Sequence, residues 1–146
     1  MATIQLGPYR GVTTVMSTEL NSLAATTGKA ISSAIDNSTD LDLFADLELA
    51  VDFVSAPTAG TVIELYLLPS VDGTVYPDGS GSVLPQSSLF VDKFAVRAVT
   101  TAQVMVARGV ALPPGSLKWL VQNTTNQAFP ASGSTLRMNA YQLQSV

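Results

Sequence analysis

The sequence predicts an all-β fold, a sandwich or a barrel of short antiparallel strands. Its 10 glycines and 8 prolines are spread along the 146 residues. They separate short segments rich in Val, Leu, Thr and aromatic residues, which is the spacing typical of such folds. Helix signals are few, because only residues 17–25 have a helical pattern, and it allows about two turns at most. A chain of this length forms one domain, and with no cysteine it must fold without disulfides.

The clearest strand covers residues 40–53, where every second residue is apolar without a break. A strand points one set toward the core and the other, which holds five carboxylates, to the opposite face. The expected core set is Leu41, Leu43, Ala45, Leu47, Leu49, Val51 and Phe53.

Further strands are expected from the same criteria. The stronger segments are 61–68, 89–99, 102–109, 116–122 and 135–143, and the weaker ones are 11–16 and 29–35. Pro114 and Gly115 suit the central positions of a type II turn and predict a hairpin between residues 110–112 and 117–121.

Two further features locate a loop and a core residue. Residues 69–88 hold several glycines, prolines and serines, including Asp72-Gly73 and Asp78-Gly79, and form the longest irregular segment. We expect this loop to be the functional tip. Trp119 alternates with Leu117 and Val121, so we expect it in the core, beside Phe53, Phe94 and Met138.

The composition excludes several classes of function. The chain has no histidine and no cysteine, which removes the usual catalytic base and thiolate nucleophiles or zinc ligands. Only 12% of residues are charged and the net charge is -4, which argues against a nucleic-acid surface. No segment is long and apolar enough for a membrane helix, and the first residues lack the pattern of a signal peptide. We therefore expect no enzyme, no cofactor, no metal site, and synthesis in a cytoplasm.

The acidic face of residues 40–53 has three interpretations. Carboxylates two residues apart on a strand lie about 6.6 Å apart, within the range of an inverting glycosidase pair. However, the sequence shows no aromatic cleft for a hydrolase and no calcium loop. A solvated or interface face is therefore favoured over a calcium site and over catalysis.

The charges are segregated along the chain. Between residues 30 and 92 every charged side chain is acidic, and after that every one is basic. Either the two sets pair across strands within one sandwich, or the acidic patch of one subunit meets the basic patch of a neighbour. The apolar fraction of 47% favours shared surface as well. The candidate interface residues are Asp42, Asp46, Glu48, Tyr66, Leu68, Arg97 and Arg137.

Residues 66–74 read Tyr-Leu-Leu-Pro-Ser-Val-Asp-Gly-Thr, and four further segments stand out, residues 18–24, 45–49, 112–115 and 127–133. These segments resemble a group of small structural proteins of tailed bacteriophages and prophages, and residues 66–74 are the most specific of them. The resemblance implies a jelly-roll-like β-sandwich. It also implies a capsid decoration or cement protein on the outside of the virion, partnered by the major capsid protein. From the apolar fraction and the segregated charge we expect association with other copies as well, as a dimer or trimer.

A non-enzymatic cement role agrees with the missing catalytic residues. Residues 1–27 are poor in charge and rich in Ser and Thr, and we expect an N-terminal arm that orders on binding, followed by one sandwich domain over residues 28–146. The alternative is a carbohydrate- or receptor-binding module of a phage tail or fibre, which exposed Tyr66 and Tyr76 beside the long loop would favour.

Overall fold

The computed structural model describes residues 2–145 as β-strands joined by loops and two short 3-10 turns. The strands are β1 (Ile4–Leu6), β2 (Val12–Met16), β3 (Gly28–Ile31), β4 (Ile35–Asp36), β5 (Phe44–Val51), β6 (Val62–Pro69), β7 (Phe90–Ala95), β8 (Gln103–Ala111), β9 (Ser116–Asn123), β10 (Thr135–Tyr141) and β11 (Leu143–Ser145). The 3-10 turns are Thr18–Leu20 and Ser87–Leu89.

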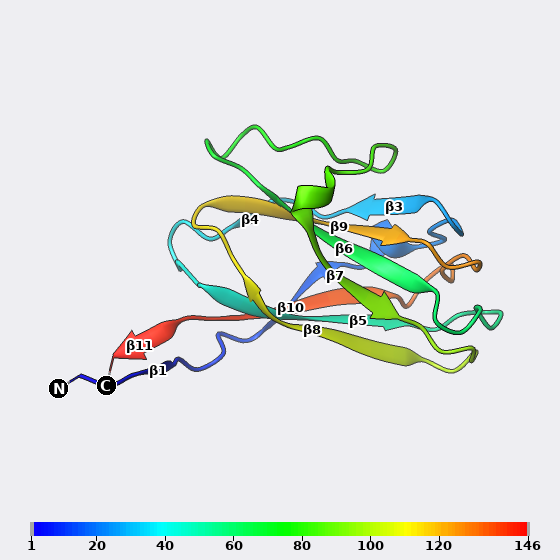
Figure 1. Cartoon of the computed structure of the whole chain (residues 1–146), viewed down its shortest axis with the longest axis horizontal. Coiled ribbons are helices and arrows are strands. Elements are labelled where there is room, and N and C mark those ends of the chain that lie inside the picture. The colour runs from blue at the N-terminus through cyan, green and yellow to red at the C-terminus, as the bar shows by residue number, and fades with distance from the viewer. Residues whose placement is uncertain (1, 146) are drawn as a thin grey trace.

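Two antiparallel sheets pack face to face (Figure 1). The first has the order β2-β10-β5-β8, and the second has the order β3-β9-β6-β7, with β4 also paired to β9. The chain crosses repeatedly between the two sheets, and among the described strands only β6 and β7 are both consecutive in the chain and paired as neighbours in one sheet. Such crossings are typical of a jelly roll. The predicted all-β, jelly-roll-like sandwich is confirmed, and a closed barrel is excluded for the residues described.

The alternation predicted for residues 40–53 holds over β5, where the core-facing residues are buried in turn. It fails before the strand, because Leu41 and Leu43 are exposed and Asp42 is buried. Asn37 exchanges hydrogen bonds with the Asp42 backbone, and Leu41 takes a positive φ of 51°. This turn changes the direction of the backbone before β5 begins. The alternation of buried and exposed side chains is therefore limited to the residues that pair in the sheet.

The expected core surrounds Trp119, whose side chain is 0% exposed. Phe53, Phe94 and Met138 belong to the same buried cluster, as predicted. The cluster fills the space between the two sheets and includes inward-facing residues of β5, β6, β9 and β10. The packing of these large side chains is the main source of stability.

The predicted hairpin at Pro114-Gly115 is wrong. β8 pairs with β5 in the first sheet, whereas β9 pairs with β6 in the second. The intervening turn, where Gly115 has a φ of +97°, carries the chain from one sheet to the other. A tight turn looks the same in sequence whether the next strand pairs with the last one or crosses to the facing sheet.

The N-terminal segment divides at Val12 rather than at residue 27. Residues 2–11 form the extended arm, in which β1 pairs with β11 beside the chain ends (Figure 1). β2 is an edge strand of the first sheet, and Met16, Leu20 and Leu23 are buried in the core. Residues 12–23 are therefore part of the sandwich. Their few apolar side chains pack against core residues from distant parts of the chain, which the local sequence does not reveal.

The long loop after β6 lies over the outer face of the second sheet (Figure 1). Gly79 sits so close to this face that an added Cβ would lie 2.6 Å from the Leu68 side chain and 3.5 Å from Leu120. Tyr66, Leu68 and Leu120 form a second buried cluster there. Leu68 thus lies under the protein's own loop, and the ring of Tyr66, in the same buried cluster, packs against Phe90. Both side chains are buried, so the expectation that they form an outer interface is wrong for this fold.

Candidate functional site

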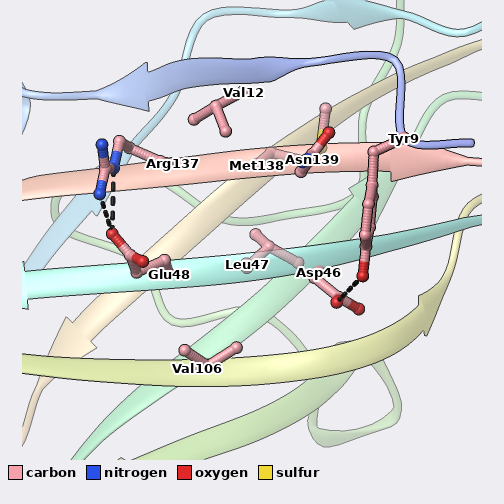
Figure 2. A pocket seen from close by; sticks show the side chains of 9 residues that line it. All are labelled: Tyr9, Val12, Asp46, Leu47, Glu48, Val106, Arg137, Met138 and Asn139. Carbon is pink, nitrogen blue, oxygen red and sulfur yellow. Dashed lines mark hydrogen bonds and ion pairs between the residues drawn. The ribbon is translucent and has the colours of Figure 1, made fainter.

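An open groove with a volume of about 300 Å³ crosses the outer face of the first sheet. Figure 2 shows outward side chains of all four strands around it, with Tyr9 of the N-terminal arm standing across one end. The lining residues are Tyr9, Val12, Asp46, Leu47, Glu48, Val106, Arg137, Met138 and Asn139. The outward positions of each strand alternate with core positions, which is why side chains far apart in sequence meet here.

One side of the groove holds an ion pair between neighbouring strands. Glu48 on β5 and Arg137 on β10 lie directly opposite in the register. Arg137 donates from Nε to Glu48 Oε1 at 3.0 Å, and its Nη2 contacts the same oxygen. Both side chains are partly exposed, so this pair fixes orientation more than it adds stability.

The other side of the groove is organised around Asp46. Its carboxylate accepts hydrogen bonds from the Tyr9 hydroxyl at 2.6 Å, the Gly109 amide at 2.8 Å and Arg108 Nε at 3.4 Å. Partial burial raises the pKa of Asp46, but these donors together outweigh it and lower the pKa below its ordinary value. Asp46 is therefore a fixed acceptor that ties the arm to the sheet.

Aromatic rings gather next to Asp46. Tyr9 packs edge-on against Tyr141 with ring centroids 5.2 Å apart, and Phe44 stacks on Tyr141 at 5.7 Å. Burial, and then the charge of Asp46, raise the pKa of Tyr141. A second depression of about 300 Å³ opens here, between the arm, Arg108 and Tyr141. The polar groups and rings together form a surface suited to binding.

The structure brings three of the seven candidate interface residues into this groove: Asp46, Glu48 and Arg137. Asp42 lies near the end of the sheet, where Arg10 Nε contacts it at 2.6 Å. Arg97 is exposed in the loop after β7, where its side chain has no ion pair among residues 2–145. Tyr66 and Leu68 lie on β6 in the second sheet, away from the groove, and are buried on the outer face of that sheet.

Two of the basic residues after residue 92, Arg108 and Arg137, form ion pairs with acidic residues of the same chain. Arg10, Arg108 and Arg137 each contact a carboxylate of the same chain. Acids and bases therefore meet across strands within one sandwich. An intermolecular contact of Glu48 with Arg137 of a neighbour would first have to break the pair inside each copy.

Sequence reasoning missed Tyr9, Val12, Val106, Arg108 and Asn139 as parts of this surface. Asn139 could have been found, because it shares the outward parity of Arg137 on one strand. Val106 could have been found in the same way on β8. No local signal places Tyr9, since only the folding back of the arm brings it to Asp46.

No three potential metal ligands lie close enough to hold an ion in the part of the chain that the structure describes. Within the same residues, no helix is long and apolar enough to cross a membrane. The groove carboxylates are held by arginines, a tyrosine and a backbone amide.

No protein-family model matches this chain, and no curated protein matches it by sequence. Among solved structures, a carbohydrate-binding module of family 36, determined with calcium and xylotriose, is 9% identical with a TM-score of 0.43, covering 98% of this chain and 93% of that one. A family 36 module of a xylanase from the hindgut metagenome of Trinervitermes trinervoides is 9% identical with a TM-score of 0.42, covering 100% and 97%. A family 35 module from Cellvibrio japonicus is 18% identical with a TM-score of 0.41, covering 99% and 97%. Similarity this distant says nothing about a ligand of this chain.

Proposed function

We propose that this chain is a non-enzymatic virion structural protein that decorates the outside of a tailed-phage capsid as a homo-oligomer. The resemblance of residues 66–74 to small virion proteins supports the class of protein. The observation that carries the proposal is the outer face of the first sheet, an open surface with exposed valines on both edge strands and charges already paired within the chain.

This surface has the properties of a protein-docking face. Val12 lies on one edge strand, and Val104 and Val106 lie on the other, all exposed. Between them the Glu48–Arg137 and Asp46–Arg108 pairs leave little net charge. Apolar side chains at the edges bury well against a partner, while the paired charges give specificity at a modest desolvation cost.

Binding to phage particles that lack this protein tests the proposal. Wild type should saturate the particles, and Val106→Glu should weaken binding at least about tenfold, because an unpaired charge would enter the contact. Val54→Glu is the matched control, since Val54 is also exposed but lies in the loop after β5. Failure of wild type to bind such particles would overturn the decoration role. Equal losses with both variants would overturn the assignment of the face.

The second candidate function is a carbohydrate- or receptor-binding module of a phage tail or fibre. The sequence links this function to exposed Tyr66 and Tyr76 side chains. Tyr66 is buried. The Tyr76 hydroxyl forms a hydrogen bond with Ser116, and Lys118 Nζ lies over its ring. A different observation favours it: the half-exposed ring of Tyr9 stands beside Asp46, Arg108 and Tyr141. Rings next to polar side chains suit sugar recognition.

A glycan array separates the two candidates. Under the second, wild type would bind defined glycans and Tyr9→Phe, which keeps the ring but removes the hydroxyl bonded to Asp46, would retain more binding than Tyr9→Ala. If the protein is a capsid decoration protein, wild type would bind phage particles and show no binding to any glycan on the array.

A further inference from the structure

The long loop after β6 holds two Asp-Gly pairs, Asp72-Gly73 and Asp78-Gly79. An aspartate followed by glycine can rearrange spontaneously, because glycine has no Cβ to shield its backbone nitrogen from the aspartate side chain. The two pairs are the same dipeptide in the same loop. The structure nevertheless gives them different surroundings.

Asp72 is held in place by its own loop. Its Oδ1 atom accepts hydrogen bonds from the amides of Thr74 and Val75, each at 2.8 Å, and from the Ser70 hydroxyl at 3.2 Å. These bonds fix the direction of the side chain and lower the pKa of Asp72 to about 2, so the carboxyl stays ionised. An ionised carboxylate has no good leaving group. The bonds therefore protect Asp72 from attack by the next amide nitrogen.

Asp78 has no such protection. Its side chain is exposed, and within residues 2–145 its carboxylate accepts no hydrogen bond and forms no ion pair. The amide nitrogen of Gly79 likewise donates to no acceptor in that part of the chain. Both reacting groups of this pair are therefore free of competing bonds.

We propose that Asp78-Gly79 is a site of spontaneous aspartate isomerisation, at which the folded protein converts Asp78 to isoaspartate while Asp72-Gly73 reacts far more slowly. The proposal goes beyond the proposed function and does not rest on it. It assigns a covalent modification to the loop that lies over the outer face of the second sheet (Figure 1).

The reaction is a ring closure followed by hydrolysis. The Gly79 nitrogen loses its proton and attacks Cγ of the Asp78 carboxyl in its protonated form. The new N–C bond forms as the hydroxyl leaves, so one water is released and a five-membered succinimide results. Water then adds to one of the two ring carbonyls. Opening at the side-chain carbonyl restores aspartate, whereas opening at the main-chain carbonyl gives isoaspartate, without any change in oxidation state.

Isomerisation inserts one extra carbon into the backbone where the loop fits most closely. In isoaspartate the chain runs through the former side-chain methylene, so the path from residue 78 to Gly79 becomes longer. A Cβ on Gly79 would already lie 2.6 Å from the Leu68 side chain and 3.0 Å from the Pro85 ring. The site has no room for an added carbon, so the modification displaces Gly79 from Leu68.

The loop is anchored on both sides of this pair. Before it, the Tyr76 hydroxyl forms a hydrogen bond with Ser116. After it, the Ser80 amide donates to the Val83 carbonyl at 2.9 Å, and the Val83 amide donates to the Ser80 hydroxyl at 3.0 Å. Sliding of the loop therefore does not absorb the extra carbon, and the displacement stays close to Gly79.

Peptide mass spectrometry of the full chain, stored folded for several weeks at about 37 °C and about pH 7, tests the proposal. Electron-transfer dissociation identifies isoaspartate through cleavage at its extra backbone carbon. Isoaspartate should accumulate at residue 78 at least about fivefold faster than at residue 72, because hydrogen bonds hold only the Asp72 carboxylate. Asp78→Glu is the matched control, since it keeps the charge but requires a slower six-membered ring closure. It should stay unmodified at residue 78.

Storage in guanidinium chloride separates the effect of structure from that of sequence. Unfolding removes the hydrogen bonds to Asp72, so both pairs should then isomerise at nearly the same rate. Equal rates at residues 72 and 78 in the folded protein overturn the proposal. It is also overturned if residue 78 stays unmodified, or if the ratio of the two rates is the same in folded and unfolded protein.

The melting temperature of the modified protein tests the structural consequence. The isoaspartate form, separated from the Asp78 form by chromatography, should melt at a lower temperature, because Gly79 no longer packs on Leu68. Equal melting temperatures would overturn the displacement of the loop.

Discussion

Trp119 is the residue on which the core most depends. It is fully buried between the sheets, so Trp119→Ala should lower the free energy of unfolding by about 3–5 kcal/mol, the usual cost of deleting a large buried aromatic side chain. Urea denaturation measures the change. Trp119→Phe should cost less, because the indole Nε1 has no hydrogen-bond partner within residues 2–145 and its loss leaves no new polar group unpaired. A stable Trp119→Ala that loses only binding would contradict the core assignment.

Asp72 gives the loop after β6 a dependence on pH. Its carboxylate accepts from the amides of Val75 and Thr74, each at 2.8 Å, and these bonds lower its pKa to about 2. Since the folded pKa is below the unfolded one, the carboxylate stabilises the fold above about pH 4, and this contribution is lost as pH falls toward 2.

We therefore expect Asp72→Asn to be less stable than wild type at pH 7, with the difference in melting temperature shrinking between about pH 5 and 2. The control is Asp78→Asn, which removes the same charge from the same loop, where Asp78 accepts no hydrogen bond among the described residues. If the difference in melting temperature between Asp72→Asn and wild type did not change with pH, the negative charge of Asp72 would not be the source of its stabilising effect.

At the scale of elements, the loop over the second sheet is held by close packing at Gly79. A Cβ there would lie 2.6 Å from the Leu68 side chain and 3.0 Å from the Pro85 ring. Because Leu68 is fully buried and has little room to shift, Gly79→Ala should displace the loop and cost about 1–3 kcal/mol. Gly81→Ala is the control, because its nearest neighbour is the Lys29 carbonyl oxygen at 3.6 Å, an ordinary contact.

Tyr66 reports the same movement. Burial in the cluster with Leu68 and Leu120, and then the hydrogen bond to Glu64, raise the pKa of Tyr66 to about 12. When Gly79→Ala lifts the loop, that pKa should fall toward 10, as measured by ultraviolet titration, whereas Gly81→Ala should leave it unchanged. An unchanged titration in Gly79→Ala would mean that the loop does not cover this cluster in solution.

At the scale of the whole molecule, we expect stability without bound metal. Asp42 is held by Arg10, and Asp46 by Tyr9, Gly109 and Arg108, so neither carboxylate is free to bind a cation. EDTA should leave the melting temperature within about one degree. A drop of roughly ten degrees would require a structural cation at these carboxylates, by mass-action linkage.

The sequence by itself determined the strands and most of the core. Alternation located β5 to within a few residues, because a strand between a core and solvent must alternate. Segments of strand length between turn residues located β6, β9 and β10 equally well. Bulk and apolar neighbours were enough to place Trp119 inside. The turn at Asp72-Gly73 was also readable, since Gly73 has a φ of +80° that other residues avoid.

Only the tertiary structure decided which strands pair and which outward residues remain exposed. Pro114-Gly115 joins two sheets instead of two neighbouring strands. Tyr66 and Leu68 have the parity of surface residues, yet Phe90 packs on Tyr66 and a loop some ten residues further along the chain covers Leu68. Tyr9 meets Asp46 across 37 positions. Each of these outcomes depends on contacts between distant segments, which a local pattern does not encode, because alternation fixes the side of a strand on which a residue lies but not what packs against that side.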